Sequence, residues 1–443
     1  DQVIPMYWWS NMAVPEYPFG QIIVPAATAY TCKNWEVYKV NVPEVDGNNI
    51  FHYESIPDQI DYFFDIPYEC PKYIANVNKD GYGLLQTSTR RLRARKLFSW
   101  GHNEGSDRWQ HFLTEDAGPY IEIQAGLGKT QYGCLPMAPH TAWEWLEQYG
   151  PVQLPQTTSS QDNCQYIEQH VSSEELERLL QTSASFAHQK AAVVSSGSPH
   201  GAMRNLEATV SPKKKALSDH LDFRSCPENE WTHLLTKGSF VTADPDQIPG
   251  DFQCAAVYYE QLKKAVKTTD SENWYAYYHL GLMHWFHGKH KKARKMLERS
   301  IALQPSAWAY HGLAVLTFSD RDQRISYIKK GLALCNFDLS YVKEAFRILL
   351  LEEAFSELLD CYNHLPEQIQ TERRIHFCYL TALSKTGQYK KGYDLLMREP
   401  DYVLDDIREG EDSIGSLYSA LYEGVFGEAP NEIPAHWNFN SFI

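Results

Sequence analysis

The chain has 443 residues and carries 41 Lys and Arg against 56 Asp and Glu, a formal net charge of −15. This balance excludes a nucleic-acid partner, because phosphate neutralisation needs clustered basic residues. With 43% hydrophobic residues and no apolar run of about eighteen, the composition indicates a globular protein without a membrane span. The length predicts two or three domains.

Residues 1–152 have the pattern of an antiparallel β domain. Short runs rich in Val, Ile, Tyr and Phe recur, as at 21–24 and 61–65, and turn signals such as Asp80-Gly81 separate them. No helical periodicity lasts more than a turn here. Strands at this spacing predict a sandwich or barrel rather than a parallel α/β sheet.

Residues 153–250 predict a connector with short helices and loops. Ser172 followed by Glu175 is a capping-box signal for one such helix. The Ser-, Gly- and Pro-rich stretch at 195–201 is typical of a loop. We expect this segment to lie over the β domain.

Residues 251–443 predict a tetratricopeptide-like α-solenoid. Counted from Trp274, small or apolar residues and a terminal proline fall at the repeat positions, namely Leu280, Gly281, Gly288, Ala293, Leu297 and Pro305. A second copy fits from Arg373, with a degenerate unit between the two. Such an array suits a protein partner or self-association, or it stabilises the β domain.

Aromatic, carboxylate and amide side chains are concentrated at 96–151. Flat rings cover the apolar face of a pyranose, and polar groups beside them take its hydroxyls. The residues predicted to bind a saccharide ligand are Trp100, His102, Arg108, Trp109, Tyr120, Gln124 and Trp143. The alternatives are core packing for the tryptophans and a structural role for the histidine.

The segment 120–125 predicts a strand with one apolar and one polar face. Tyr120, Glu122 and Gln124 point one way, and the intervening residues point the other. The polar row is either a solvent-facing strand or a ligand-binding face with a carboxylate at its centre. We take Glu122 as the leading candidate for a catalytic group.

Two further carboxylates are candidates for the catalytic pair. Glu16 follows Val14-Pro15, and Glu147 alternates with Trp143 and Trp145. Glycosidic hydrolysis needs two carboxylates, so Glu122 with Glu16 or Glu147 would serve it. Sugar epimerisation needs a general base and acid, and Glu122 with His102 would serve that. The sequence leaves this choice open.

Other chemistries lack their motifs. No Gly-x-Ser-x-Gly elbow, Walker loop or His-Glu-x-x-His motif is present, so we expect neither a cofactor nor a metal. Nine cysteines form an odd set without a Cys-x-x-Cys pair. This pattern favours a reducing compartment, and we expect a cytoplasmic protein.

Several long motifs in residues 5–152 resemble the domain of unknown function DUF5107. They are MYWWSNMAVPE at 6–16, DYFFDIP at 61–67, GLLQTST at 83–89 and the stretch 96–151, with GSPHGA at 197–202 resembling a glycine motif of the connector. The resemblance implies a galactose-mutarotase-like β-supersandwich that binds carbohydrate on a broad concave sheet, often followed by tetratricopeptide-like repeats. It also implies that about half of the sandwich lies upstream of Asp1.

One segment departs from the family pattern. Residues 130–136 read TQYGCLP, where the resemblance implies Thr-Gln-x-Glu-His-Leu-Pro. A carboxylate and an imidazole are therefore missing. Three functions stay open: a glycoside hydrolase, which we favour; an aldose epimerase or mutarotase; and a non-catalytic sugar-binding scaffold whose repeats bind a protein.

Overall fold

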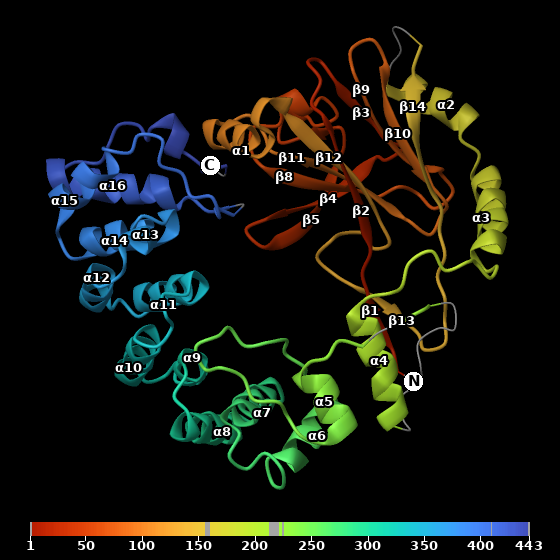
Figure 1. The fold of residues 1–443 in the computed structure, drawn as a ribbon. Helices are drawn as coiled ribbons and strands as arrows, with labels where there is room; N and C mark the ends of the chain where they lie inside the picture. The colour runs from red at the N-terminus through yellow and green to blue at the C-terminus, as the bar shows by residue number, and fades with distance from the viewer. Residues whose placement is uncertain (1, 156–159, 212–220, 224–225, 409, 442–443) are drawn as a thin grey trace. The chain divides into compact units, whose positions relative to one another are not determined.

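The structure is a computed structural model that describes residues 2–155, 160–211, 221–223, 226–408 and 410–441. The chain divides into two compact units. The first comprises residues 1–189, 407–416 and 431–443, and the second comprises 190–406 and 417–430. The β-rich first unit and the helical second unit are drawn in Figure 1.

The first unit contains a six-stranded antiparallel sheet. Its strands, in spatial order, are β2 (Trp9–Pro15), β12 (Tyr120–Gly126), β11 (Ala94–Ser99), β8 (Ile60–Phe64), β4 (Thr28–Lys33) and β5 (Glu36–Asn41). The antiparallel sheet predicted from the turn-punctuated runs is thus present.

A second, four-stranded antiparallel sheet belongs to the same unit. Its spatial order is β14 (Glu147–Gln153), β10 (Tyr82–Ser88), β9 (Lys72–Val77) and β3 (Gln21–Ile23). Two small ribbons complete the strands, β1 (Ile4–Met6) with β13 (Leu135–Met137), and β6 (Glu44–Val45) with β7 (Asn48–Asn49).

The two larger sheets share one apolar core. Ile121, Ile123 and Leu97 from the six-stranded sheet join Ile22 and Ile74 from the four-stranded sheet in a single buried cluster. Burial of such side chains is the main stabilising term in folding. The opposite face of the six-stranded sheet is therefore free to carry polar groups.

Within the described residues, three α-helices lie wholly in the first unit. They are α1 (Glu104–Thr114), α2 (Ser160–His170) and α3 (Ser173–Ala187). Helix α3 begins as its capping signal predicts, because the Ser172 hydroxyl accepts a hydrogen bond from the backbone N–H of Glu175. Helix α1 was not predicted, since Gly101 and Gly105 gave its start the pattern of a loop.

The second unit is built from paired helices. Its helices are α4 (Pro199–Val210), α5 (Glu230–Lys237), α6 (Ala256–Ala265), α7 (Trp274–Phe286), α8 (His290–Leu303), α9 (Ala307–Leu316), α10 (Arg321–Leu332), α11 (Leu339–Leu351), α12 (Phe355–Asn363), α13 (Glu367–Gln370), α14 (Arg373–Lys385) and α15 (Tyr389–Leu396). The division between the units falls within α16 (Ser413–Phe426).

The tetratricopeptide-like pattern is confirmed in the α7–α8 pair. A Cβ on Gly281 would lie 2.8 Å from Leu297 Cγ, so only glycine allows this approach of the two helices. Ala293 and Leu297 are both buried on the facing side of α8. None of the helices within the described ranges is long and apolar enough to cross a membrane.

Candidate functional site

The polar face of the six-stranded sheet carries a pocket of about 410 Å³, called here the sheet pocket. Four predicted site residues line it: Trp100, Trp109, Tyr120 and Glu122. Six further lining residues were not singled out by the sequence: Asp61, Lys96, Phe98, Leu113, Gln131 and Ile407.

Strand pairing brings the charged residues together. Phe98 of β11 pairs with Glu122 of β12 on one side and with Asp61 of β8 on the other. Lys96 pairs with Gln124 in the same way. Paired residues share a face of the sheet, so these side chains converge.

Glu122 lies at one end of a polar network. Its Oε2 accepts hydrogen bonds from Asn11 Nδ2 and Gln124 Nε2, both at 2.8 Å. The predicted alternation of this strand is confirmed, since Ile121 and Ile123 are buried in the core behind it.

Asp61 lies at the other end of the network. Lys96 Nζ is 2.6 Å from Asp61 Oδ1 and donates a hydrogen bond to Gln131 Oε1 at 2.8 Å. Tyr132 donates to Asp61 Oδ2 at 3.2 Å. Burial, together with Asp61, raises the pKa of the Tyr132 phenol, which keeps it a donor.

The departing segment 130–136 borders this network. Its Gln131 donates to Gln124 Oε1 at 2.5 Å, and its Tyr132 reaches Asp61. Gly133, where the resemblance implies a glutamate, has open space around its Cβ position. Cys134, where the resemblance implies a histidine, is exposed.

Trp100 and Trp109 are walls of the pocket rather than open platforms. They stack on each other with ring centroids 6.0 Å apart and are only 3% and 1% exposed. Trp109 Nε1 also donates to the carbonyl of Phe439 at 2.8 Å. Both rings are buried rather than exposed as sugar platforms, because they pack on each other and Phe439 of the C-terminal segment packs on Trp109. Tyr120 is the half-buried aromatic residue of this group.

Arg108 holds the C-terminal segment. Its Nε donates to the carbonyl of His436 at 3.0 Å, and its guanidinium lies over the Phe439 ring. The Phe439 ring and the His436 carbonyl thus contact the Arg108 side chain, which was predicted to bind sugar.

Glu16 and His102 form a pair with each other. His102 Nε2 lies 2.8 Å from Glu16 Oε1, and the Glu16 side chain is only 6% exposed. The hydrogen bond to Glu16 raises the pKa of His102 against the opposing effect of burial. Neither residue is part of the described lining of the sheet pocket.

Glu147 lies on the other side of the six-stranded sheet from Glu122. Its Oε2 accepts hydrogen bonds from Ser10 Oγ at 2.6 Å and Tyr149 OH at 2.5 Å. Ser10 and Asn11 are consecutive in β2, so their side chains point to opposite faces. Asn11 bonds Glu122, and hence the sheet separates the two carboxylates.

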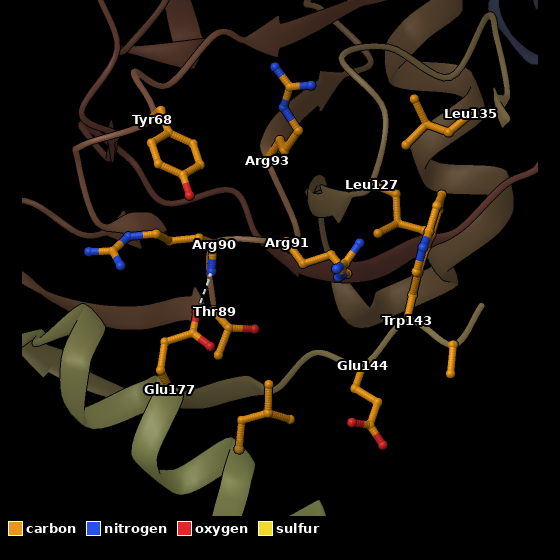
Figure 2. Close-up of a pocket in the computed structure, with 12 residues that line it drawn as sticks. Tyr68, Thr89, Arg90, Arg91, Arg93, Leu127, Leu135, Trp143, Glu144 and Glu177 are labelled. Carbon is orange, nitrogen blue, oxygen red and sulfur yellow. Dashed lines mark hydrogen bonds between the residues drawn. The ribbon is translucent and has the colours of Figure 1, made fainter. Parts of the chain in front are cut away.

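Trp143 lies in a second pocket, where Arg91 lies over its ring with the guanidinium carbon 5.2 Å from the centroid (Figure 2). The residues 141–146 around it form no strand. Both Trp143 and Trp145 nevertheless pack on the same small apolar cluster, around Leu127.

Lys96 and Phe98 could have been found from strand parity alone, because both point to one face of β11, whereas Asp61 lies on β8. Nothing local indicated that β8 pairs beside them. Throughout the described part of the chain, no group of three or more His, Cys, Asp or Glu is placed to hold a metal.

No family model matches the chain. Its structure is similar to that of a TPR-domain containing protein from Parabacteroides distasonis ATCC 8503, with a TM-score of 0.57 and 17% identity. The match covers 99% of this chain and 68% of that chain. At this identity the likeness shows the fold alone, a β-sheet region followed by paired helices. The resemblance to DUF5107 stays a prediction.

Proposed function

We propose that the chain is a glycoside hydrolase that binds a saccharide in the sheet pocket. The observation that carries the proposal is the presence of two carboxylates, Asp61 and Glu122, in one pocket beside aromatic walls. The predicted partners of Glu122 are replaced, since Glu16 pairs with His102 and Glu147 lies across the sheet.

The spacing of the two carboxylates suits hydrolysis. Asp61 and Glu122 lie on strands that flank β11, so two strand spacings, roughly 10 Å, separate their backbones. Both side chains line the same pocket. Carboxyl groups about 6.5–9.5 Å apart leave room for a water, as inverting glycosidases require. We therefore favour inversion.

The surroundings of each carboxylate assign its role. Asp61 is ion-paired with Lys96, so it serves as the general base. We assign the general-acid role to Glu122, whose partners are neutral amides, both at Oε2. Glu122 protonates the glycosidic oxygen as its bond to the anomeric carbon breaks. Water attacks that carbon and gives its proton to Asp61.

The motif resemblance supports the same function. DUF5107-like sequence implies a mutarotase-like supersandwich with a carbohydrate-binding concave sheet, and the sheet pocket lies on such a polar sheet face. Function nevertheless depends on the site rather than on the fold. The proposal therefore stands on Asp61 and Glu122.

The test is turnover of a panel of aryl glycosides and oligosaccharides by the intact protein and three variants. We expect Glu122→Gln and Asp61→Asn each to lower kcat by about 10²–10⁴-fold, the usual contribution of a general acid or base. Glu260→Gln, in an exposed pair on α6, should leave kcat unchanged. Turnover by wild type that survives in both site variants would refute the assignment.

The second candidate is a non-catalytic sugar-binding scaffold. The observation that favours it is that protein groups already bond both carboxylates, through Lys96 and the amides. In that case calorimetry detects saccharide binding, but the wild-type protein has no turnover. The paired helices then bind another protein or a second copy of this chain. The epimerase alternative, which needs Glu122 with His102, has weaker support, because His102 pairs with Glu16 and does not line the sheet pocket.

A further inference from the structure

A second pocket of the β-rich unit is built around arginines. It has a volume of about 930 Å³ and is called here the arginine pocket. The turn Thr89–Arg93, which joins β10 to β11, supplies Arg90, Arg91 and Arg93, and the loop between β13 and β14 supplies Trp143 (Figure 2). Helix α3 closes one side with Glu177.

Two of the three guanidinium groups are not neutralised. Arg90 NH2 pairs with Glu174 at 3.2 Å, and its backbone N–H donates to Glu177. Among the described residues, Arg91 and Arg93 form no ion pair with a carboxylate, and both are exposed. The remaining acid of the pocket, Glu144, hydrogen-bonds His188.

The pocket also offers aromatic surface. Arg91 lies over Trp143, a contact that orients its planar fork. Tyr68 lines another side and is 70% exposed. One ligand could therefore contact both a guanidinium group and an exposed aromatic ring.

The arginine pocket and the sheet pocket are neighbours along two chain segments. Lys96 of β11 lines the sheet pocket and Arg93, just before this strand, lines the arginine pocket, roughly 10 Å of extended backbone away. Leu127 and Leu135 line the arginine pocket, and Gln131 between them lines the sheet pocket. Two short chain segments therefore link the linings of the two pockets.

We propose that the arginine pocket binds the anionic group of an acidic saccharide, a uronate carboxylate or a sulfate ester, whose reacting part occupies the sheet pocket. This inference rests on the proposed function and names its substrate class. Arginine forks bind oxyanions with two parallel hydrogen bonds, which gives both affinity and orientation.

The charge of the whole chain strengthens the argument. A net charge of −15 repels an acidic polymer, so two unpaired arginines in one pocket supply a local attraction. Because Arg91 and Arg93 are exposed, salt screens this attraction. Affinity for the acidic saccharide should accordingly fall as the salt concentration rises, and affinity for a neutral saccharide should not.

The test is calorimetric binding of oligosaccharides in matched pairs: neutral against uronate-containing, and unsulfated against sulfated, with the same backbone. We expect wild type to bind one acidic member about tenfold more tightly than its neutral match. The double variant Arg91→Gln/Arg93→Gln should lose this preference and keep its affinity for the neutral sugar, because the loss of a charge-assisted contact costs about one order of magnitude in Kd.

A charge-matched control is Arg178→Gln/Arg299→Gln, which removes two exposed arginines outside both pockets. It should keep the preference for the acidic saccharide. Which pair shows the preference distinguishes uronate from sulfate. Equal binding of neutral and acidic sugars by wild type would overturn this inference alone. Absence of any saccharide binding would overturn the proposed function and this inference with it.

Discussion

Asp61 and Glu122 are the two ends of one continuous chain of hydrogen bonds. Asp61 pairs with Lys96, Lys96 bonds Gln131, Gln131 bonds Gln124, and Gln124 bonds Glu122. The two ends come from strands β8 and β12, whereas Gln131 comes from the loop after β12. A ligand that enters the sheet pocket therefore meets groups whose positions depend on one another.

Within this hydrogen-bonded network, the loss of Lys96 should lower the free energy of unfolding most. Its side chain is 7% exposed, so Lys96→Met leaves the Asp61 charge uncompensated. We expect the free energy of unfolding to fall by about 3 kcal/mol, the low end for a broken buried pair because Asp61 is partly exposed. Urea unfolding measures this.

The matched control is Lys39→Met. Lys39 lies 3.0 Å from Asp65, with side-chain exposures of 47% and 24%. Exposed pairs are screened by solvent, so this variant should unfold nearly as wild type does. An equal decrease in the free energy of unfolding in the two variants would show that the Lys96–Asp61 pair stabilises the fold no more than an exposed pair does.

Glu147 and Glu122 should respond in opposite ways to the same substitution. Glu147 accepts hydrogen bonds from Ser10, Gln86 and Tyr149. Glu147→Gln should lower the free energy of unfolding by about 1–3 kcal/mol, because a donor replaces an acceptor in a packed polar cluster. Turnover per folded molecule should persist, whereas Glu122→Gln should lose turnover with little loss of stability. A Glu147→Gln variant that is stable and inactive would return Glu147 to the catalytic pair.

The C-terminal segment should control the wall of the sheet pocket. A Cβ on Gly105 of α1 would lie 1.9 Å from the carbonyl oxygen of Asn440, so Gly105→Ala must displace that segment. Overpacking of this kind costs about 1–3 kcal/mol. Phe439, which accepts the Trp109 indole N–H, should move with it, and saccharide affinity should fall.

Gly150→Ala is the control for this substitution, since its Cβ position has no neighbour within 4 Å. Calorimetric affinity and urea unfolding should both match wild type in the control. If Gly105→Ala lowers the free energy of unfolding but leaves saccharide affinity unchanged, the C-terminal segment does not influence binding in the pocket.

The predictable part of the site is what local periodicity determines. Alternation along β12 placed Glu122 and Gln124 on the polar face with Ile121 and Ile123 behind them. In the helical unit, the repeat spacing placed Gly281 where two helices touch. Each of these inferences needs only neighbouring residues or a fixed period.

The remaining part depends on contacts between distant segments. Asp61 joins Glu122 only through the order of the strands, and Trp109 is buried by Phe439, which lies 330 residues away in the sequence. Helix α1 likewise depends on a contact between distant segments. Gly105 lowers its intrinsic helix propensity, and the close backbone of Asn440 makes a glycine necessary there.

His102 should make stability depend on pH. The hydrogen bond to Glu16 raises the pKa of His102 above its ordinary value of 6.5 in the folded protein. The folded state therefore binds the proton more tightly than the unfolded state. The stabilisation is fully present below about pH 6.5 and is lost as the pH rises through the folded pKa. Urea unfolding between about pH 5.5 and 8.5 should show this loss in wild type and not in His102→Gln or Glu16→Gln. If both variants keep the wild-type dependence of stability on pH, the His102–Glu16 pair is not its cause.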